Sequence, residues 1–317
     1  MRIYLISKYL IFFLTTIIIL FISLTKSLSE ENVFTINNVK VKGTIDVNFT
    51  REKYFNKAFL NSFEILMNKI LLTRDLKKID DVKLKEIKNL ISNFQIIEES
   101  YSEDMYRANI KISYRENKIK YFLGKRNISF SSPENISAVF FPVFFIDNEI
   151  QNFNENYFYT NWSEVKIKNE LINFILPIED LDDIAEITKM KNNIEDLDVV
   201  TLVNKYDQKN YVFALISYKE KNLNIYIKTN FNNNKTSKNI LYKIKNIRDE
   251  SELNIILKDL KLKVTDLWKE QNLVNLLMPL TLKVKFKHMT LKDLDKIRNV
   301  FYKISIIDNF TLKEFNI

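Results

Sequence analysis

Four carboxylates lie within five positions of the segment LPIEDLDDIAEI, residues 176–187: Glu179, Asp180, Asp182 and Asp183. Such a cluster can bind Ca²⁺ or Mg²⁺, which prefer oxygen ligands, or supply the acid and base of a hydrolytic reaction. A metal would need further ligands from elsewhere, because the spacing and the central glycine of an EF-hand are missing. Asp180 and Asp183 would then be the metal ligands, and a metal-dependent hydrolase is the alternative function.

The same carboxylates also have a structural explanation. Negative charge stabilises the first turn of a helix by about 0.3–1 kcal/mol per group. Asp180 can cap the backbone N–H groups there, and Asp183, three positions on, can complete a capping box. We favour this interpretation and predict a helix that starts near Asp180 rather than a metal site.

The residue types that the chain lacks exclude several kinds of chemistry. There is no cysteine, so thiolate catalysis, disulfides and cysteine-based zinc or iron–sulfur sites are excluded. His288 is the only histidine and only two glycines occur, which excludes two-histidine metal sites and glycine-rich phosphate-binding loops. We therefore predict no catalytic residue and no cofactor, and interpret His288 as the end of a strand.

Lysines alternate with apolar residues in LTLKVKFKH, residues 280–288, so that Lys283, Lys285 and Lys287 share one face of a predicted strand. Residues 233–317 contain 17 basic and 10 acidic side chains, a net charge of +7. Such a face fits an acidic protein, an anionic lipid or another anionic envelope component. We favour a solvated surface or a guarded edge strand, and keep Lys283, Lys285 and Lys287 as candidate partner-binding residues. No nucleic-acid-binding motif is present.

Trp162 is a further candidate for binding, because it lies in an otherwise polar loop. A tryptophan in this position is either a packing anchor or an exposed contact for a partner. We favour packing, and keep Trp162 beside the three lysines as a candidate partner-binding residue.

The N-terminal segment, residues 1–29, has the order of a secretory signal peptide. Arg2 and Lys8 precede an uncharged apolar run over 9–24, and small residues follow, with cleavage expected after Ser29. The run is slightly shorter than the roughly 17 to 25 residues of a membrane-spanning helix, so a retained anchor is the alternative. In both cases the early positive charges place the rest of the chain outside the cytoplasm. We predict a periplasmic protein, or one anchored in the inner membrane and facing the periplasm, with membrane contact only through this segment.

Residues 30–130 are predicted to form an N-terminal α+β module. A weakly alternating strand over 33–47 precedes an amphipathic helix over 51–73, and a second helix and a hairpin follow. The apolar positions of the long helix recur at three- and four-residue steps: Phe55, Phe59, Phe63, Leu66 and Ile70. The turn residues SFSSPEN, at 129–135, end the module.

Residues 134–230 are predicted to form a central, α/β-like mixed-sheet module. The segment ISAVFFPVFFID, at 136–147, is apolar almost throughout, which is typical of a strand buried on both faces. Pro142 is expected at a bulge or strand end, because proline cannot donate to a neighbouring strand. A strand over 171–176, short helices and a hairpin complete the sheet, and the asparagine-rich segment 230–239 is the next predicted boundary.

Residues 236–317 are predicted to form a C-terminal basic α+β module. It begins with a long helix that has one apolar face, continues through the strand 280–288 and a helix over 291–301, and ends on a strand. This order is compatible with a ferredoxin-like fold. The predicted fold class is therefore α+β, with two or three small mixed-sheet modules and helices packed on the sheets.

The order of several stretches resembles an uncharacterised family of exported bacterial envelope proteins, the domain of unknown function two-zero-six-six. The stretches that carry the resemblance are KAFLNSFEILMNKILLT, ANIKISYRENKIKYFL, VFFPVFFI, the pair NW, LPIEDLDDI and YDQKNYVFALIS. Together they cover most of the chain after the leader. The resemblance implies an exported envelope location and no particular reaction.

These observations predict an exported envelope protein that faces the periplasm and binds or scaffolds rather than catalyses. The expected partner is an envelope protein or an anionic envelope component, and we expect no binding to nucleic acid. The basic C-terminal module is the expected contact surface, because the positive charge is concentrated there.

Overall fold

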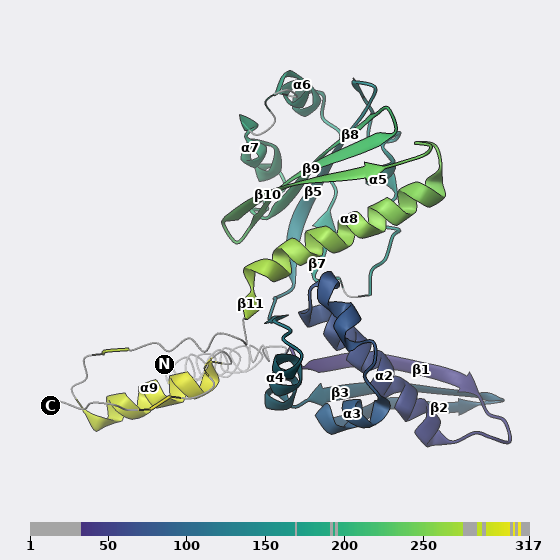
Figure 1. Cartoon of the computed structure of the whole chain (residues 1–317), viewed down its shortest axis with the longest axis vertical. Coiled ribbons are helices and arrows are strands. Elements are labelled where there is room, and N and C mark those ends of the chain that lie inside the picture. The colour runs from purple at the N-terminus through teal and green to yellow at the C-terminus, as the bar shows by residue number, and fades with distance from the viewer. Residues whose placement is uncertain are drawn as a thin grey trace, which may run out of the picture.

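A computed structural model describes residues 33–168, 170–190, 193, 196–274, 284–286, 290–304, 307, 310 and 311. Over these residues the chain forms two units, each built on its own β-sheet, and one long helix reaches from the second unit to the first (Figure 1). Helices pack on both sheets, so the predicted α+β fold class is confirmed.

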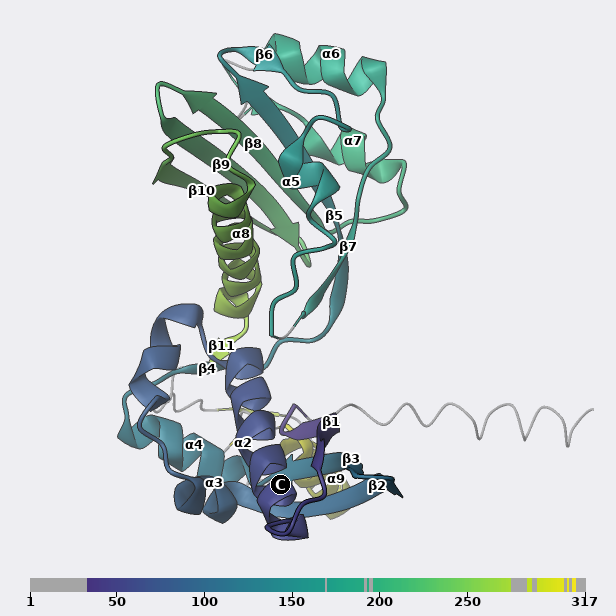
Figure 2. The ribbon, with the colours of Figure 1, turned by 90° about the vertical axis from the view of Figure 1, so that its right-hand side faces the viewer.

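The first unit is a three-stranded antiparallel sheet with helices on one side. Its strands lie in the order β1 (Thr35–Thr44), β3 (Met105–Tyr114) and β2 (Ile91–Ser102). Helix α2 (Arg51–Ile70) lies along the sheet (Figure 2), and its buried side chains meet the inward positions of β1 and β3. The shorter elements are η1 (Thr73–Ile79), α3 (Leu84–Leu90), α4 (Glu116–Lys125) and β4 (Phe130–Ser131).

Alternation along the strands gives this sheet one buried face and one open face. Successive side chains of a strand point to opposite faces. In β3 the residues that face α2 are buried: Tyr106, Ala108, Ile110, Ile112 and Tyr114. The residues between them face solvent, and β1 follows the same alternation opposite them. The open face therefore carries polar and charged side chains.

The second unit is a mixed sheet. Strand β5 (Ile136–Ile146) is parallel to β8 (Tyr211–Lys219) on one side and to the short β7 (Ile172–Ile175) on the other. The antiparallel strands are β9 (Asn222–Phe231) next to β8, β10 (Asn234–Lys243) at the edge, and β6 (Glu149–Ile150) beside the end of β5.

Helices cover both faces of this sheet (Figure 1). One face packs against α8 (Glu250–Gln271) and α5 (Tyr157–Thr160), and the other against α6 (Leu181–Met190) and α7 (Val199–Asn204). Phe140 and Phe144 of β5 belong to the first core, whereas Phe141 and Phe145 belong to the second. The prediction that this strand is buried on both faces is confirmed.

Pro142 lies in the middle of β5, so its predicted place at a bulge or strand end is wrong. The register with β8 runs through Pro142 without a shift. On the opposite side, β7 pairs with residues 136–139 and β6 with residues 145–146. Pro142 falls in the gap between them, where β5 needs no donor, and its carbonyl oxygen accepts from Asn156 Nδ2 at 3.0 Å.

The predicted boundary at residues 230–239 is also wrong, because this segment is a hairpin rather than a linker. β9 and β10 pair outward from Phe231 and Asn234, which leaves only Asn232 and Asn233 in the turn. Both asparagines have positive φ angles, 50° and 67°, which suit the turn that two-residue hairpins favour. Asparagine enters this region more readily than most other residues, so it serves as the turn residue in a glycine-poor chain.

β10 and α8 therefore belong to the second unit, and no separate module begins at residue 236. The predicted apolar face of α8 is confirmed, and it packs on the central sheet through Leu253, Ile256, Leu257, Leu260, Val264, Leu267 and Trp268. The described residues of 236–317 do not form the predicted ferredoxin-like arrangement, since α8, its first helix, covers the central sheet.

After α8 the chain returns to the first unit. β11 (Leu273–Val274) pairs with β4, and α9 (Leu291–Lys303) matches the predicted C-terminal helix. Of the predicted strand 280–288, only residues 284–286 are described, in no helix or strand, and the leader 1–29 lies outside the described residues. Among the helices described from residue 33 onward, none combines the length and hydrophobicity that crossing a bilayer requires.

The end of α8 fastens the second unit to the first through a buried lysine. Lys269 is 4% exposed, and its Nζ donates to the carbonyl oxygens of Asn68 and Leu71, at 2.7 Å from each. These carbonyls lie at the C-terminal end of α2, whose partial negative charge favours a cation. Beside them, both carboxylate oxygens of Asp266 accept from the Thr73 N–H at 3.1 Å.

We expect Lys269→Met to lower the free energy of unfolding by about 1–3 kcal/mol, because the buried Leu71 carbonyl and the partly buried Asn68 carbonyl lose this donor. Lys258→Met, at an exposed position of the same helix, is the control and should change it by less than about 0.5 kcal/mol. Urea unfolding at pH 7 is the measurement. Equal unfolding midpoints for the two variants would show that the lysine does not fasten the units.

The pH dependence of stability tests the same ammonium. Burial lowers the pKa of Lys269 to about 8, although the negative charge of Asp266 acts to raise it. A lysine in the unfolded chain has a pKa of about 10.4. Between these values the unfolded chain binds more protons, so the free energy of unfolding rises with pH. Lys269→Met should flatten this rise, and an unchanged slope would contradict the lowered pKa.

Candidate functional site

The acidic segment forms the helix start that the sequence predicts, and a lysine from another element pairs with it. α6 begins at Leu181, directly after Asp180, whose Oδ1 accepts from the Asp182 N–H at 2.9 Å. Lys205 Nζ lies 2.7 Å from Asp180 Oδ2 and 2.6 Å from Asp183 Oδ2. Because Lys205 directly follows α7, these ion pairs join the end of α7 to the start of α6.

Asp183 does not close the predicted capping box, because its carboxylate turns to Lys205 instead. Hydrogen bonds from Lys205 and from a backbone N–H hold the pKa of Asp180 below its usual value. Glu179 accepts from the Phe153 N–H at 2.9 Å. The structure thus brings together the two residues assigned to a metal, with an ammonium group between them. Over the described residues, no three His, Cys, Asp or Glu side chains gather closely enough to hold a metal ion.

Trp162 is a packing residue, so the favoured interpretation is confirmed, and its alternative role as an exposed partner contact is wrong. Its exposed fraction is 1%, and its ring stacks on Phe140 with the centroids 3.6 Å apart. Lys261 of α8 lies beside the indole and donates to the carbonyl oxygens of Trp162 and Val165, at 3.2 and 2.7 Å. A second buried lysine of α8 therefore holds this loop.

The predicted basic strand is described only at its centre. Lys285 is exposed, while Lys283 and Lys287 lie outside the described residues, as does His288. The surface formed by the three lysines therefore stays a prediction.

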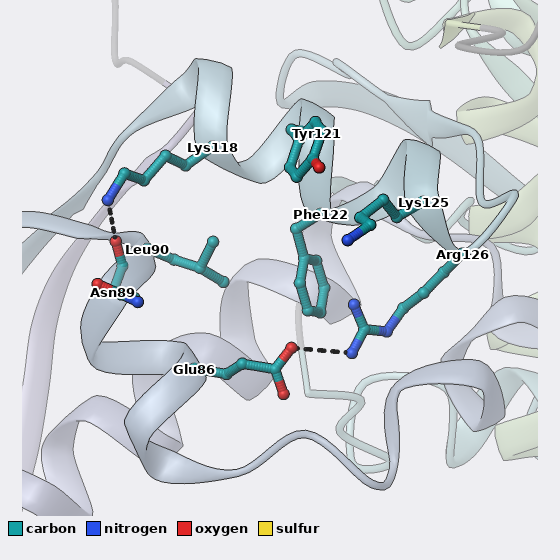
Figure 3. A pocket seen from close by; sticks show the side chains of 8 residues that line it. All are labelled: Glu86, Asn89, Leu90, Lys118, Tyr121, Phe122, Lys125 and Arg126. Atoms are coloured by element: carbon teal, nitrogen blue, oxygen red, sulfur yellow. Dashed lines mark hydrogen bonds and ion pairs between the residues drawn. The ribbon is translucent and has the colours of Figure 1, made fainter.

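A pocket of about 580 Å³ lies between α3 and α4 of the first unit (Figure 3). Leu90 and Phe122 form its apolar centre, and the Arg126 guanidinium lies 4.0 Å from the Phe122 ring. Arg126 also donates to Glu86 at 3.0 Å, so these two charged groups engage each other across the pocket. With Lys125 at its rim, the pocket suits an apolar group that carries negative charge. Its lining offers no paired nucleophile and base of the kind that a reaction needs.

Strand β2 presents a free edge with exposed apolar side chains, which the sequence analysis missed. It is the outer strand of its sheet and pairs only with β3 over the described residues. Phe94, Ile97 and Tyr101 are 43%, 53% and 56% exposed. At Ile97 the register shifts, so this residue is a bulge with no partner in β3. Within the part of the chain that the structure describes, no strand pairs with the outer edge of β2, so its backbone groups can accept another strand.

A hollow of about 450 Å³ adjoins the first half of this edge. Phe59, Ile91 and Phe94 contribute its apolar lining, and the Phe59 and Phe94 rings meet edge to face. Lys88 lies at the same hollow and forms an ion pair with Glu52 at 3.4 Å. A strand that paired with β2 could place an apolar side chain in this hollow.

The two other long edge strands differ from β2 in their side chains. β10 carries Lys235, Lys238 and Lys243, and β1 carries Lys40 and Lys42. Charged side chains, lysine above all, protect an edge from pairing with other strands. β2 has no lysine and three large exposed apolar side chains, so it is the edge best suited to bind another chain.

The far end of β2 is held by the carboxylate of Glu99. Glu99 accepts two hydrogen bonds from the Arg51 guanidinium, and single ones from the hydroxyls of Tyr106 and Tyr101, at 2.7 and 3.2 Å. The hydrogen bond from Arg51 is the largest cause that holds the pKa of Glu99 below its usual value, and the hydrogen bond from the Tyr106 hydroxyl also lowers it. These contacts hold β2 to the start of α2 and to β3, so the far end of the free edge is fixed in position.

No family model matches this sequence, and no curated protein matches it either. The resemblance to the exported envelope family therefore stays a prediction.

Replacing Lys205 by methionine should raise the pKa of Asp180 toward the ordinary value of about 3.9, since the hydrogen bond from Lys205 is the largest cause of its lowering. Titration of the Asp180 carboxyl carbon by NMR provides the measurement. Lys209→Met, at an exposed position nearby in the sequence, is the control. An Asp180 pKa that responds to neither change would show that the ion pair does not form in solution.

Proposed function

We propose that this protein is an exported, non-enzymatic binding protein that faces the periplasm and recognises an extended segment of another envelope protein. The recognition element is the free edge of β2 with the apolar hollow beside it. The leader of residues 1–29 supports the location, because its charges and apolar run follow the order of an export signal.

The observation that carries this proposal is that β2 combines an edge that no described strand pairs with and three exposed apolar side chains. Such an edge promotes aggregation unless a partner covers it. A strand added to β2 would hydrogen-bond to its unpaired edge and would also cover the exposed apolar side chains. Backbone hydrogen bonds to β2 supply affinity, and pockets for alternate side chains supply specificity.

The side chains around β2 define the chemistry of the segment that fits. The hollow beside Phe94 accepts an apolar side chain, and Lys88 at that hollow favours an acidic residue close to it. Glu98, exposed beyond the bulge, favours a basic residue toward the other end of the segment. A peptide with an apolar anchor between opposite charges is therefore the expected ligand.

The variant Ile97→Lys tests this site, because it places a lysine on the edge at a residue that is half exposed. Leu241→Lys is the matched control, since Leu241 is 58% exposed on the edge strand β10. The tagged full chain is captured from solubilised envelopes, and co-purified proteins are quantified by mass spectrometry. We expect one protein to be recovered by the wild type and by Leu241→Lys, and about tenfold less by Ile97→Lys, as for the loss of a binding hot spot.

Hydrogen exchange then locates the contact. Binding of a peptide from the recovered protein should protect the amides of β2 and leave those of β10 unchanged. Equal recovery by the three forms would reject β2 as the site. Loss of the partner only when Lys283, Lys285 and Lys287 are all changed to glutamate would move the contact to the C-terminal basic segment.

The location is checked independently by mass spectrometry of the N-terminal peptide from cells, combined with protease treatment of permeabilised cells. We expect either cleavage after Ser29 or a membrane-bound chain that external protease digests. An unprocessed chain that is soluble inside the cytoplasm would refute the proposed location, whatever the result for β2.

A further inference from the structure

The open face of the first sheet carries a group of four cations. Lys40 and Lys42 project from β1, and Arg107 and Lys111 project from β3, all four exposed. Val39 and Val41, which alternate with the lysines, are buried under α2 on the other face. Four basic side chains from adjacent strands thus lie on the same side of the sheet.

The arrangement of these cations is unfavourable for the isolated sheet. Lys42 lies directly opposite Arg107 in the register of β1 and β3, and like charges in this position destabilise a strand pair. Within the described residues none of the four basic side chains forms an ion pair. Glu98, opposite Asn109, is the acidic residue that β2 adds to this face. The face therefore has excess positive charge without a partner of its own.

The position of this face along the chain points to the partner. β1 begins at Thr35, and the predicted apolar run of the leader ends at residue 24, so about ten residues separate them. At no more than roughly 3.6 Å per residue, this linker spans at most about 40 Å. If the leader is retained, or while it is still uncleaved, β1 stays within that reach of the bilayer.

We infer that the open face of the β1–β3 pair binds anionic lipid headgroups at the bilayer surface. This inference rests on the proposed export of the chain, but not on the proposed role of β2. Basic residues close to an anionic bilayer each strengthen binding about fivefold. The four cations lie on one sheet face, so an anionic surface can contact all of them together. The negative charge of that surface then offsets their mutual repulsion.

The contact adds to the membrane attachment predicted from the leader alone. A tethered chain with this face on the headgroups would hold the first sheet flat against the bilayer. The free edge of β2 would then lie close to the membrane surface, where membrane-anchored envelope proteins leave the bilayer.

Lysine acylation of the full chain, as isolated from envelopes, tests the contact. The chain is bound to or reconstituted in vesicles of phosphatidylcholine alone or mixed with phosphatidylglycerol. We expect acylation of Lys40, Lys42 and Lys111 to slow at least about fivefold on the anionic vesicles, as expected for groups at a charged surface. Lys235 and Lys238 of β10 are exposed internal controls and should react equally in both.

Two further measurements make the result specific. Protection should vanish in about 1 M salt, where the Debye length is only about 3 Å. Lys42→Glu combined with Arg107→Glu should abolish the protection of Lys40, whereas Lys235→Glu combined with Lys238→Glu should not. These outcomes are independent of partner capture through Ile97, so the two proposals succeed or fail separately.

Equal acylation of Lys40, Lys42 and Lys111 on both kinds of vesicle would overturn the inference. Protection by a soluble anionic polysaccharide, without protection by vesicles, would equally overturn it and assign the face to a polymer. An unprocessed cytoplasmic chain would refute export, yet the acylation pattern would still report whether this face recognises anionic lipid.

Discussion

Two lysines of α8 are buried, and each must find hydrogen-bond acceptors, because an unpaired ammonium group inside a protein is costly. Lys261 finds them mainly in the loop that carries Trp162, and Lys269 finds them at the end of α2. Four of these acceptors are backbone carbonyls, and Glu170 is a further acceptor for Lys261 at 3.2 Å, so the lysines mainly fix the path of the chain. One helix therefore holds the central sheet, the loop beside it and the first unit in a single arrangement (Figure 2).

The long elements were predictable because the burial of their apolar faces leaves a period in the sequence. The faces of α2 and α8 follow from that period, whereas the doubly buried β5 follows from its continuous apolar run. The buried lysines leave a weaker signal in the sequence. Lys261 is four residues after Leu257 and seven before Trp268, so it falls in the apolar phase of its helix. A charged residue on the apolar face of a helix must either reach solvent through a bend in the helix or hydrogen-bond to acceptors inside the protein.

The errors share a physical cause, which is that each depends on contacts between distant residues. The role of Asp183 is set by Lys205, twenty-two positions later, and the place of Pro142 is set by where β6 and β7 stop. The asparagine-rich segment 230–239 wrongly predicts a boundary, because the same residues suit a linker and a tight hairpin. Only the pairing of β10 with β9 decides between the two. In the same way, no local pattern shows that β2 lies at the edge of its sheet, because strand order is a property of the fold.

The edge of β2 is open, yet its bulge restricts what can pair with it. The register shifts at Ser92 and at Ile97 interrupt the ladder, so regular pairing beside the hollow at Phe94 is limited to residues 93–96. Glu98, directly after the bulge, adds negative charge to the edge, and charged side chains disfavour indiscriminate edge pairing. A short segment that supplies an apolar side chain and a base near Glu98 meets neither obstacle. The bulge and the glutamate therefore act against indiscriminate pairing, while the apolar half of the edge stays available to a specific partner.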